Sequence, residues 1–251
     1  MKLEKSSSLP LDKFINLSLY DRDFGYYMKK NPFGDKGDFI TAPNISILFS
    51  EIIAIWIISF WESLGSPKKF NIIELGAGNG EMMKIIIDSF HNFPIFFKAC
   101  NFIIFEKSPS LIKIQKKKLF RSKVVWVSKI NEIKKNSSLF LANEFFDAIA
   151  IKQFRKKQNS WYEKYVNLEN KNKAFFFEKK VDIKKIEKKI DFKISNNQKF
   201  IEYSELGFDY LTNITKRKKK NTGGLLLIDY GYSEKKMKNT LQAISNHKFA
   251  N

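Results

Sequence analysis

The chain has 251 residues, of which 43% are hydrophobic and 28% are charged, and its formal net charge is +19. This composition excludes a disordered or collagen-like chain and is typical of a globular protein long enough for one well-buried α/β domain with an insertion. Cys100 is the one cysteine of the sequence. A disulfide within the chain is therefore excluded, which fits a reducing compartment.

The positive charge has two interpretations. A basic surface attracts phosphate backbones, so nucleic acid has to be considered as a partner. The plainer interpretation is compositional, because lysine, isoleucine, asparagine and phenylalanine are all frequent and have AT-rich codons. The lysines are spread along the chain and are not gathered with aromatic residues into one motif, so we favour the compositional interpretation.

The first 67 residues predict a helical segment followed by a loop and a second helix. The N-terminal sequence lacks the apolar stretch of a secretory signal. We expect a helix over residues 9–18, an ordered loop rich in glycine and proline, and a long apolar helix over 45–64. Serine and glutamate residues interrupt the second helix, which is also short for a membrane span, so we expect no transmembrane segment.

Strands and helices then alternate along the rest of the chain. The expected strands are FNIIEL (70–75), NFIIFE (101–106), VVWV (124–127), SLFLANE (138–144) and GLLLIDYG (224–231), with helices at 80–90, 109–119 and 203–220. This alternation predicts an α/β fold with a doubly wound, mostly parallel sheet. We divide the chain into an N-terminal helical and lid segment, 1–67, and a Rossmann-like domain, 68–251. A lysine-rich insertion at 152–200 carries alternating stretches that predict antiparallel strands.

A glycine-rich loop follows the first strand of the predicted sheet. Glu74 lies near the end of that strand, and Gly76, Gly78 and Gly80 follow it. Glycines at this point let the backbone turn sharply and pass close to a ligand. The spacing looks like motif I of class I S-adenosylmethionine (SAM) methyltransferases. The plainer interpretation is a tight turn that binds nothing.

Acidic residues follow the second and fourth strands. An acid at the position of Glu106 accepts hydrogen bonds from ribose hydroxyls in nucleotide-binding folds, although it could simply cap a strand end. Asn143, Glu144 and Asp147 follow the fourth strand, where a substrate would meet the methyl group. Glu144 and Asp147 could orient a guanidinium and help to take its proton. Alternatively, they are favourable acids at a helix N-terminus. The pattern indicates no metal site.

The loop over residues 34–46 is a candidate lid. It contains Asp38 and Thr41 and precedes the sheet, so it could fold over a cofactor, although an ordinary connection would also explain it.

Several motifs occur together in one order along nearly the whole chain outside the insertion. They are LYDRDFGYY (19–27), PFGDKGDFITAPNIS (32–46), FNIIELGAGNG (70–80), FEKSPSLIKIQKKKL (105–119), LANEFFDAIAIKQF (141–154) and LLLIDYGY (225–232). This set resembles the MidA family, SAM-dependent methyltransferase-like proteins associated with the assembly of respiratory complex I.

The resemblance implies a class I methyltransferase fold, SAM as the cofactor and dimethylation of a protein arginine. Gly76, Gly78, Gly80 and Glu106 would take the cofactor, together with Glu74. Asp38, Thr41, Asn143 and Glu144 would line the site. The partner would be a protein substrate, such as a complex I subunit, in the bacterial cytoplasm or in the mitochondrial matrix of a eukaryote.

The chain departs from the family pattern at a few positions. The family usually has an acid after the third-strand tryptophan, whereas Ser128 and Lys129 follow Trp126 and Val127 here. Asn44 stands where most members have glutamate, and Ser50 where most have glycine. Family members also continue beyond the last residue of this chain, so we expect an uncovered edge at the fifth strand and self-association through it. Two other functions stay open: a non-catalytic assembly factor and a nucleic-acid methyltransferase.

Overall fold

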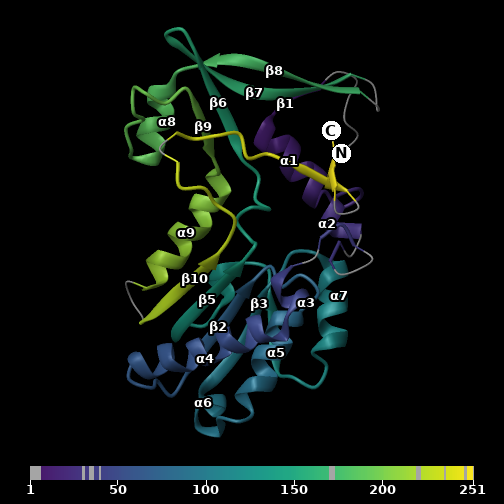
Figure 1. Cartoon of the computed structure of the whole chain (residues 1–251), viewed down its shortest axis with the longest axis vertical. Helices are drawn as coiled ribbons and strands as arrows, with labels where there is room; N and C mark the ends of the chain where they lie inside the picture. Colours follow the sequence, from purple (N-terminus) through teal and green to yellow (C-terminus); the bar gives the residue numbers. More distant parts are fainter. Residues whose placement is uncertain are drawn as a thin grey trace. The chain divides into compact units, whose positions relative to one another are not determined.

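The computed structural model describes residues 7–29, 32–33, 37–39, 41–169, 173–218, 222–234, 236–245 and 248–250. The predicted lid at 34–46 is thus described at 37–39 and 41–46, and the predicted helix end at 220 lies outside the described residues. Two compact units are present (Figure 1). Unit 1 comprises residues 1–21, 149–208 and 231–241, and unit 2 comprises 22–148, 209–230 and 242–251. The division at 67/68 stays a prediction, because compactness does not show which part folds alone.

Unit 2 contains the predicted parallel sheet. Its strands are β2 (Phe70–Leu75), β3 (Cys100–Phe105), β4 (Val124–Val127), β5 (Ser137–Asn143) and β10 (Gly223–Ile228). They lie in the order β10-β5-β2-β3-β4, and every neighbouring pair is parallel. The chain moves outward from β2 in one direction and returns to β5 on its other side. Ligands in such sheets bind beyond the carboxyl ends of the strands at this switch, here between β2 and β5.

Helices cover both faces of this sheet because successive strand residues point to opposite sides. All six residues of β2 are buried. Ile72 belongs to a core with α4 (Ile47–Ser63), α5 (Glu81–Phe90) and α6 (Pro94–Ala99). Its neighbour Ile73 belongs to the core on the other face, with η1 (Ile130–Glu132) and α9 (Glu205–Lys218). The doubly wound sheet predicted from the sequence is therefore confirmed.

Helix α4 is apolar on more than one side. Ile53, Ala54 and Ile57 face the core, and Ser50 is fully buried with a hydroxyl that has no hydrogen-bond partner in the described part of the chain. Five large apolar side chains of α4 are exposed, namely Ile47, Leu48, Ile52, Ile55 and Trp56. The helix begins at Ile47, not at residue 45, because Ser46 is extended and separates it from α3 (Ala42–Ile45). Among the described helices, none is both long and apolar enough to cross a membrane.

Strand β10 forms one edge of the parallel sheet. Its inner edge pairs with β5, and no described strand pairs with its outer edge. The two short strands that follow it, β11 (Ala243–Ser245) and β12 (Lys248–Ala250), pair only with each other among the described strands. Leu227 of β10 is 45% exposed. Self-association through this edge stays a prediction.

Unit 1 contains the predicted antiparallel insertion. Its strands are β1 (Ser7–Pro10), β6 (Lys152–Lys157), β7 (Ser160–Glu169), β8 (Lys173–Val181) and β9 (Phe200–Tyr203). Strand β7 pairs with β8 along one edge and with β6 and then β1 along the other, and β9 pairs with β6. The pairing of the N-terminal strand with β7 was not expected from the sequence. The last predicted helix, α9, begins at Glu205 because Tyr203 belongs to β9.

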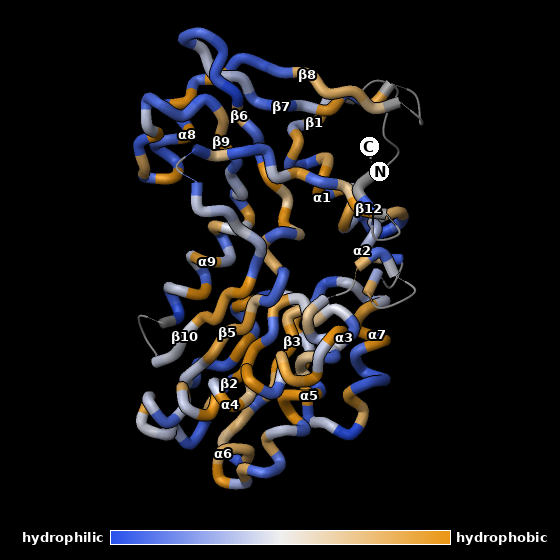
Figure 2. Tube along the Cα trace, viewed as in Figure 1, coloured by the Kyte–Doolittle hydropathy of each residue, from blue (hydrophilic) through white to orange (hydrophobic). Residues whose placement is uncertain are grey.

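Two helices cover one face of the unit 1 sheet. Ile183, Ile186 and Ile190 of α8 (Ile183–Ile190) pack against a small core that contains Phe154 and Ile201. Helix α1 (Leu11–Tyr20) approaches the same face, because Asp12 forms an ion pair with Lys152, which also pairs with Glu163. Figure 2 shows the contrast between the units: the strands of unit 2 are largely hydrophobic, whereas much of β6, β7 and α8 is hydrophilic.

Candidate functional site

The glycine loop follows β2 at the switch in strand order. Gly76, Gly78 and Gly80 have φ angles of 66°, 52° and 80°. This left-handed region disfavours any residue with a Cβ atom, so the sequence needs glycine at each of these points. A Cβ at Gly76 would lie 2.9 Å from the Phe145 ring, and one at Gly78 would lie 3.4 Å from the Phe33 ring. The loop is thus closely approached by two aromatic rings.

Glu74 is a buried acid beneath this loop. The N–H of Met83, in the first turn of α5, donates a hydrogen bond to its carboxyl group. The second carboxyl oxygen, Oε2, is buried and has no hydrogen-bond partner among the described residues. Burial, followed by the nearby charge of Glu106, raises the pKa of Glu74 to about 8. Glu74 is therefore largely protonated at neutral pH, and it has one unused oxygen.

Glu106 lies directly after β3 and is 8% exposed. Its Oε1 accepts hydrogen bonds from the N–H groups of Lys107 (2.8 Å) and Ser108 (2.9 Å). Its Oε2 accepts one from Nε2 of Gln115 (3.2 Å). A carboxylate can accept about four hydrogen bonds, so one position remains for a ligand hydroxyl. Burial raises the pKa of Glu106, and these hydrogen bonds act in the opposite direction.

Gln115 of α7 (Pro109–Lys118) connects three parts of the site. Its Nε2 donates to the Gly78 carbonyl (2.9 Å) as well as to Glu106, and its Oε1 accepts from Nε1 of Trp126 (2.9 Å). The side chain is fully buried. This residue was not predicted from the sequence. A signal was present, because Gln115 lies four positions after the buried Leu111 and thus on the inner face of the helix.

An acid does reach the region after Trp126, from a later position. Glu132 Oε2 accepts hydrogen bonds from the N–H groups of Ser128 (3.0 Å) and Lys129 (3.3 Å). The turn η1 brings this carboxylate back to the end of β4. Ser128 and Lys129 are therefore held by an acid that lies six positions after Trp126 and not directly behind it.

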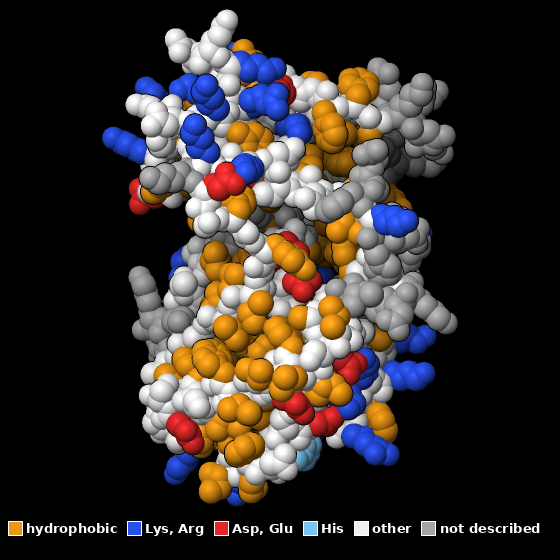
Figure 3. Space-filling model, viewed as in Figure 1, with side chains coloured by type: hydrophobic (Ala, Val, Ile, Leu, Met, Phe, Trp, Pro, Cys, Tyr) orange, Lys and Arg blue, Asp and Glu red, His pale blue; other side chains and the backbone are white. Residues whose placement is uncertain are grey.

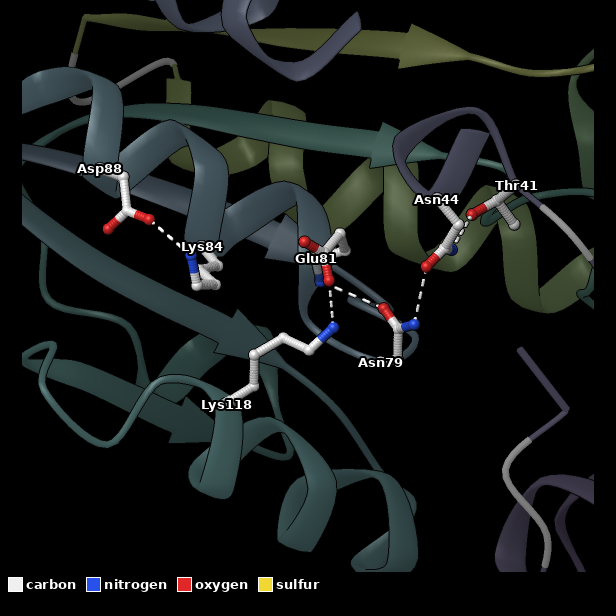
Figure 4. Close-up of polar contacts among 7 residues, drawn as sticks. All are labelled: Thr41, Asn44, Asn79, Glu81, Lys84, Asp88 and Lys118. Carbon is white, nitrogen blue, oxygen red and sulfur yellow. Dashed lines mark hydrogen bonds and ion pairs between the residues drawn. The ribbon is translucent and has the colours of Figure 1, made fainter. Parts of the chain in front are cut away.

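The described part of the candidate lid is tied to the glycine loop (Figure 4). Asn79 Nδ2 donates to Asn44 Oδ1 (2.7 Å), and Asn44 Nδ2 donates to Thr41 Oγ1 (2.8 Å). Asn79 Oδ1 also accepts from the N–H of Glu81 (3.2 Å), and Glu81 forms an ion pair with Lys118. Among the described residues of the lid, Asn44 thus links Thr41 to the glycine loop.

Aromatic residues join the lid to the acids of the site. The hydroxyl of Tyr26, in α2 (Tyr26–Lys29), donates to Asp38. Tyr27 stacks on Phe33, with ring centroids 6.3 Å apart. Burial, then Asp147 and then Glu106 raise the pKa of Tyr27. Tyr27 therefore lies within electrostatic reach of both predicted acidic positions.

The loop after β5 carries the predicted catalytic residues. Asn143 ends β5, and its Oδ1 is buried without a described hydrogen-bond partner. Glu144 has a φ of 48°, its N–H donates to the Ile228 carbonyl (2.9 Å), and its carboxylate accepts from the N–H of Ala42. Asp229, which was not predicted from the sequence, accepts at Oδ2 from the N–H groups of Phe146 (3.0 Å) and Asp147 (3.2 Å). Asp229 thus fixes the shape of this loop.

Three acids crowd this loop and influence one another. Burial, followed by the charges of Asp229 and Glu144, raises the pKa of Asp147 to about 6. Burial and Asp229 also raise the pKa of Glu144. Like charges this close favour a cationic partner, because a positive group would relieve their repulsion. The structure therefore brings the glycine loop, Glu106, part of the lid and the acidic loop together in unit 2.

Comparisons with known proteins bear on the family and the fold of this chain. The model of the family described as "Putative S-adenosyl-L-methionine-dependent methyltransferase" matches residues 52–251. The human protein arginine methyltransferase NDUFAF7, mitochondrial, is 29% identical over 192 residues, which cover 67% of this chain and 44% of the human protein. The corresponding Xenopus laevis protein is 28% identical over 194 residues, covering 68% and 44%. This chain thus spans less than half the length of these relatives.

A longer match exists in Caenorhabditis elegans. The NDUFAF7 homolog of that organism is 27% identical over 273 aligned positions, covering 98% of this chain and 64% of the relative. Among solved structures, a Burkholderia thailandensis protein bound to S-adenosyl-homocysteine has a TM-score of 0.68 and 18% identity. That match covers 82% of this chain and 55% of the solved chain, and it supports the fold.

Proposed function

Because this chain belongs to the MidA-like family of S-adenosyl-L-methionine-dependent methyltransferases, we propose that it transfers a methyl group from SAM to a guanidinium nitrogen of a protein arginine. The observation that carries this proposal is the meeting of the left-handed glycine loop, the unused oxygen of Glu74 and the acidic loop after β5.

The residues around the glycine loop fit the cofactor. Gly76 and Gly78 have no side chains that would keep a ligand away from the backbone, although the rings of Phe145 and Phe33 lie beside them. A protonated Glu74 and the free acceptor position of Glu106 offer polar groups to an amino acid moiety and to ribose hydroxyls. When bound, SAM supplies a methyl group made electrophilic by its positively charged sulfur.

The acidic loop suits a guanidinium acceptor. Arginine stays protonated in water, so its nitrogen has to lose a proton as it accepts a methyl group. Asp147 and Glu144 could align the planar group through charge-assisted hydrogen bonds. With a pKa near 6, Asp147 is ionised at neutral pH and is a stronger base than an ordinary aspartate. The names of the vertebrate relatives support arginine as the acceptor, and the MidA resemblance suggests a complex I subunit.

One observation favours a second function, a non-catalytic assembly factor. The rings of Phe33 and Phe145 lie against Gly78 and Gly76, on the loop that a cofactor would approach. If these rings keep their places, they block part of the space over the loop.

Calorimetry with SAM separates the two functions, and transfer of a radiolabelled methyl group to an arginine-containing peptide tests the chemistry. We expect micromolar binding and labelling of arginine. Asp147→Asn should keep the binding and lose most of the labelling. An absence of binding at millimolar SAM would support the assembly factor. Binding by the wild type without labelling of any arginine peptide or protein extract would contradict arginine transfer.

A further inference from the structure

The insertion concentrates the positive charge of the chain. Residues 152–200 contain fifteen lysines and arginines and six acids. Figure 3 shows lysine and arginine side chains gathered on the visible face of unit 1, which holds α8 and β6 to β9. In sequence these cations look scattered, but the strand register decides which of them share a surface.

The register places a row of alternating rings and cations across four strands. Arg155 of β6 lies directly opposite Phe200 of β9 and Tyr162 of β7, and Tyr162 lies opposite Lys180 of β8. Directly opposed residues project from the same face of a sheet. The row therefore consists of Phe200, Arg155, Tyr162 and Lys180. Phe154 precedes Arg155 in β6 and points to the opposite face, where it belongs to the core that α8 covers. The row thus lies on the face of the sheet that α8 does not cover.

Further cations and one ring extend this row. Lys157 and Lys164 lie two positions beyond Arg155 and Tyr162 and share their face. Lys157 approaches the Tyr162 ring, 5.5 Å from its centroid, and Lys164 approaches that of Phe176 at 5.0 Å. Burial and the nearby Arg155 lower the pKa of Lys164, as expected where cations crowd together.

The acids described on this face do not balance these charges. Glu178 pairs with Lys157 (2.7 Å). Glu202 is occupied by Gln153 (2.7 Å) and by Thr240. Arg155 and Lys180 are exposed and form no ion pair with an acid in the described part of the chain.

We propose that this face of unit 1 binds single-stranded nucleic acid. The lysines and Arg155 would contact phosphates, and bases would stack on the rings of Tyr162, Phe176 and Phe200. A strand surface with alternating cations and aromatic rings suits an unpaired strand better than an acidic peptide, because every base offers a ring face for stacking. This role goes beyond methyl transfer and needs neither SAM nor an active site.

The test measures fluorescence anisotropy of a labelled oligouridylate of about 12 nucleotides over a range of salt concentrations. The triple variant Arg155→Gln, Lys164→Gln, Lys180→Gln removes three charges from the row. Its matched control, Lys184→Gln, Lys185→Gln, Lys188→Gln, removes three exposed charges from α8, on the other side of the sheet. We expect only the first variant to lose affinity strongly, with the slope of log K against log salt reduced by about 2, at ~0.7 per phosphate contact.

A second pair of variants tests stacking. Tyr162→Leu keeps an apolar side chain but removes the ring, and Phe192→Leu does the same at a position that is 70% exposed beyond α8. We expect the first to weaken binding about tenfold and the second to leave it unchanged, with both variants folded by circular dichroism. Equal losses in the two triple variants would overturn the proposal, since net charge alone would then explain binding. It would also fail if oligoglutamate displaced the RNA equally well, or if the wild type did not bind.

Discussion

Replacing Gly78 by valine tests the central role of the glycine loop. Gly78 has a φ of 52°, where a residue with a side chain is strained by roughly 1–2 kcal/mol. A Cβ there would lie 3.4 Å from the Phe33 ring, so the methyl groups of valine would enter the space over the loop. We expect Gly78→Val to weaken SAM binding at least about tenfold, which corresponds to ~1.4 kcal/mol.

Gly65→Val is the matched control for backbone strain. Gly65 also has a positive φ, 78°, but a Cβ at this position would have no described atom within 4 Å beyond its chain neighbours. Both variants should lose about 1–2 kcal/mol of unfolding free energy in urea titrations, while only Gly78→Val should lose SAM affinity by calorimetry. Wild-type affinity in Gly78→Val, or an equal loss in Gly65→Val, would refute the close approach of cofactor to this loop.

Four other variants test separate parts of unit 2. Glu106→Gln should weaken SAM by about 1.5–3 kcal/mol if a charge-assisted hydrogen bond to ribose is lost; unchanged affinity in a folded protein would exclude that role. Asp229→Ala should lower methyl transfer and leave SAM binding intact, because it frees the loop that carries Asp147; equal loss of both would count against a positioning role. The pKa of Glu74 is higher in the folded protein than in the unfolded chain, so the folded protein holds this proton more tightly. The unfolding free energy should therefore fall as pH rises from 4.5 to about 8. Glu74→Gln should remove that part of the pH dependence in urea titrations, and an unaltered pH dependence would contradict this assignment. Ser50→Ala should raise the unfolding free energy by about 1 kcal/mol or more, because it removes a buried hydroxyl without a described partner; a lower value would show that the hydroxyl is satisfied.

The parallel sheet could be predicted because its strands are local apolar runs. FNIIEL is buried at all six positions, and such a run between turn residues predicts a central strand. The turn after this strand could also be predicted, since three closely spaced glycines favour a sharp turn of the backbone. Strand β1 could not be predicted, because the sequence SSLP has no strand pattern of its own and is extended through its pairing with β7.

The site residues that the sequence did not predict are polar groups whose hydrogen-bond partners are far away along the chain. Gln115 contacts Gly78, 37 positions away, and Asp229 contacts Phe146, 83 positions away. No local spacing encodes such contacts, because they exist only once the sheet has aligned its strand ends. The predicted roles of Asp38, Thr41 and Asn143 stay predictions, although the structure shows hydrogen bonds to the first two.

The pairing of β1 with β7 makes the order of synthesis matter. Ser7 pairs with Leu168, so the ribosome adds 161 residues after Ser7 before its partner has been made, which takes roughly 8 to 32 seconds at 5–20 residues per second. During that interval four of the five parallel strands of unit 2 are synthesised. Leu11, which is buried in the folded protein, lacks the strands of unit 1 that would cover it until they have been synthesised. Trimming the first ten residues would therefore remove a strand from a sheet whose other strands lie between residues 152 and 203.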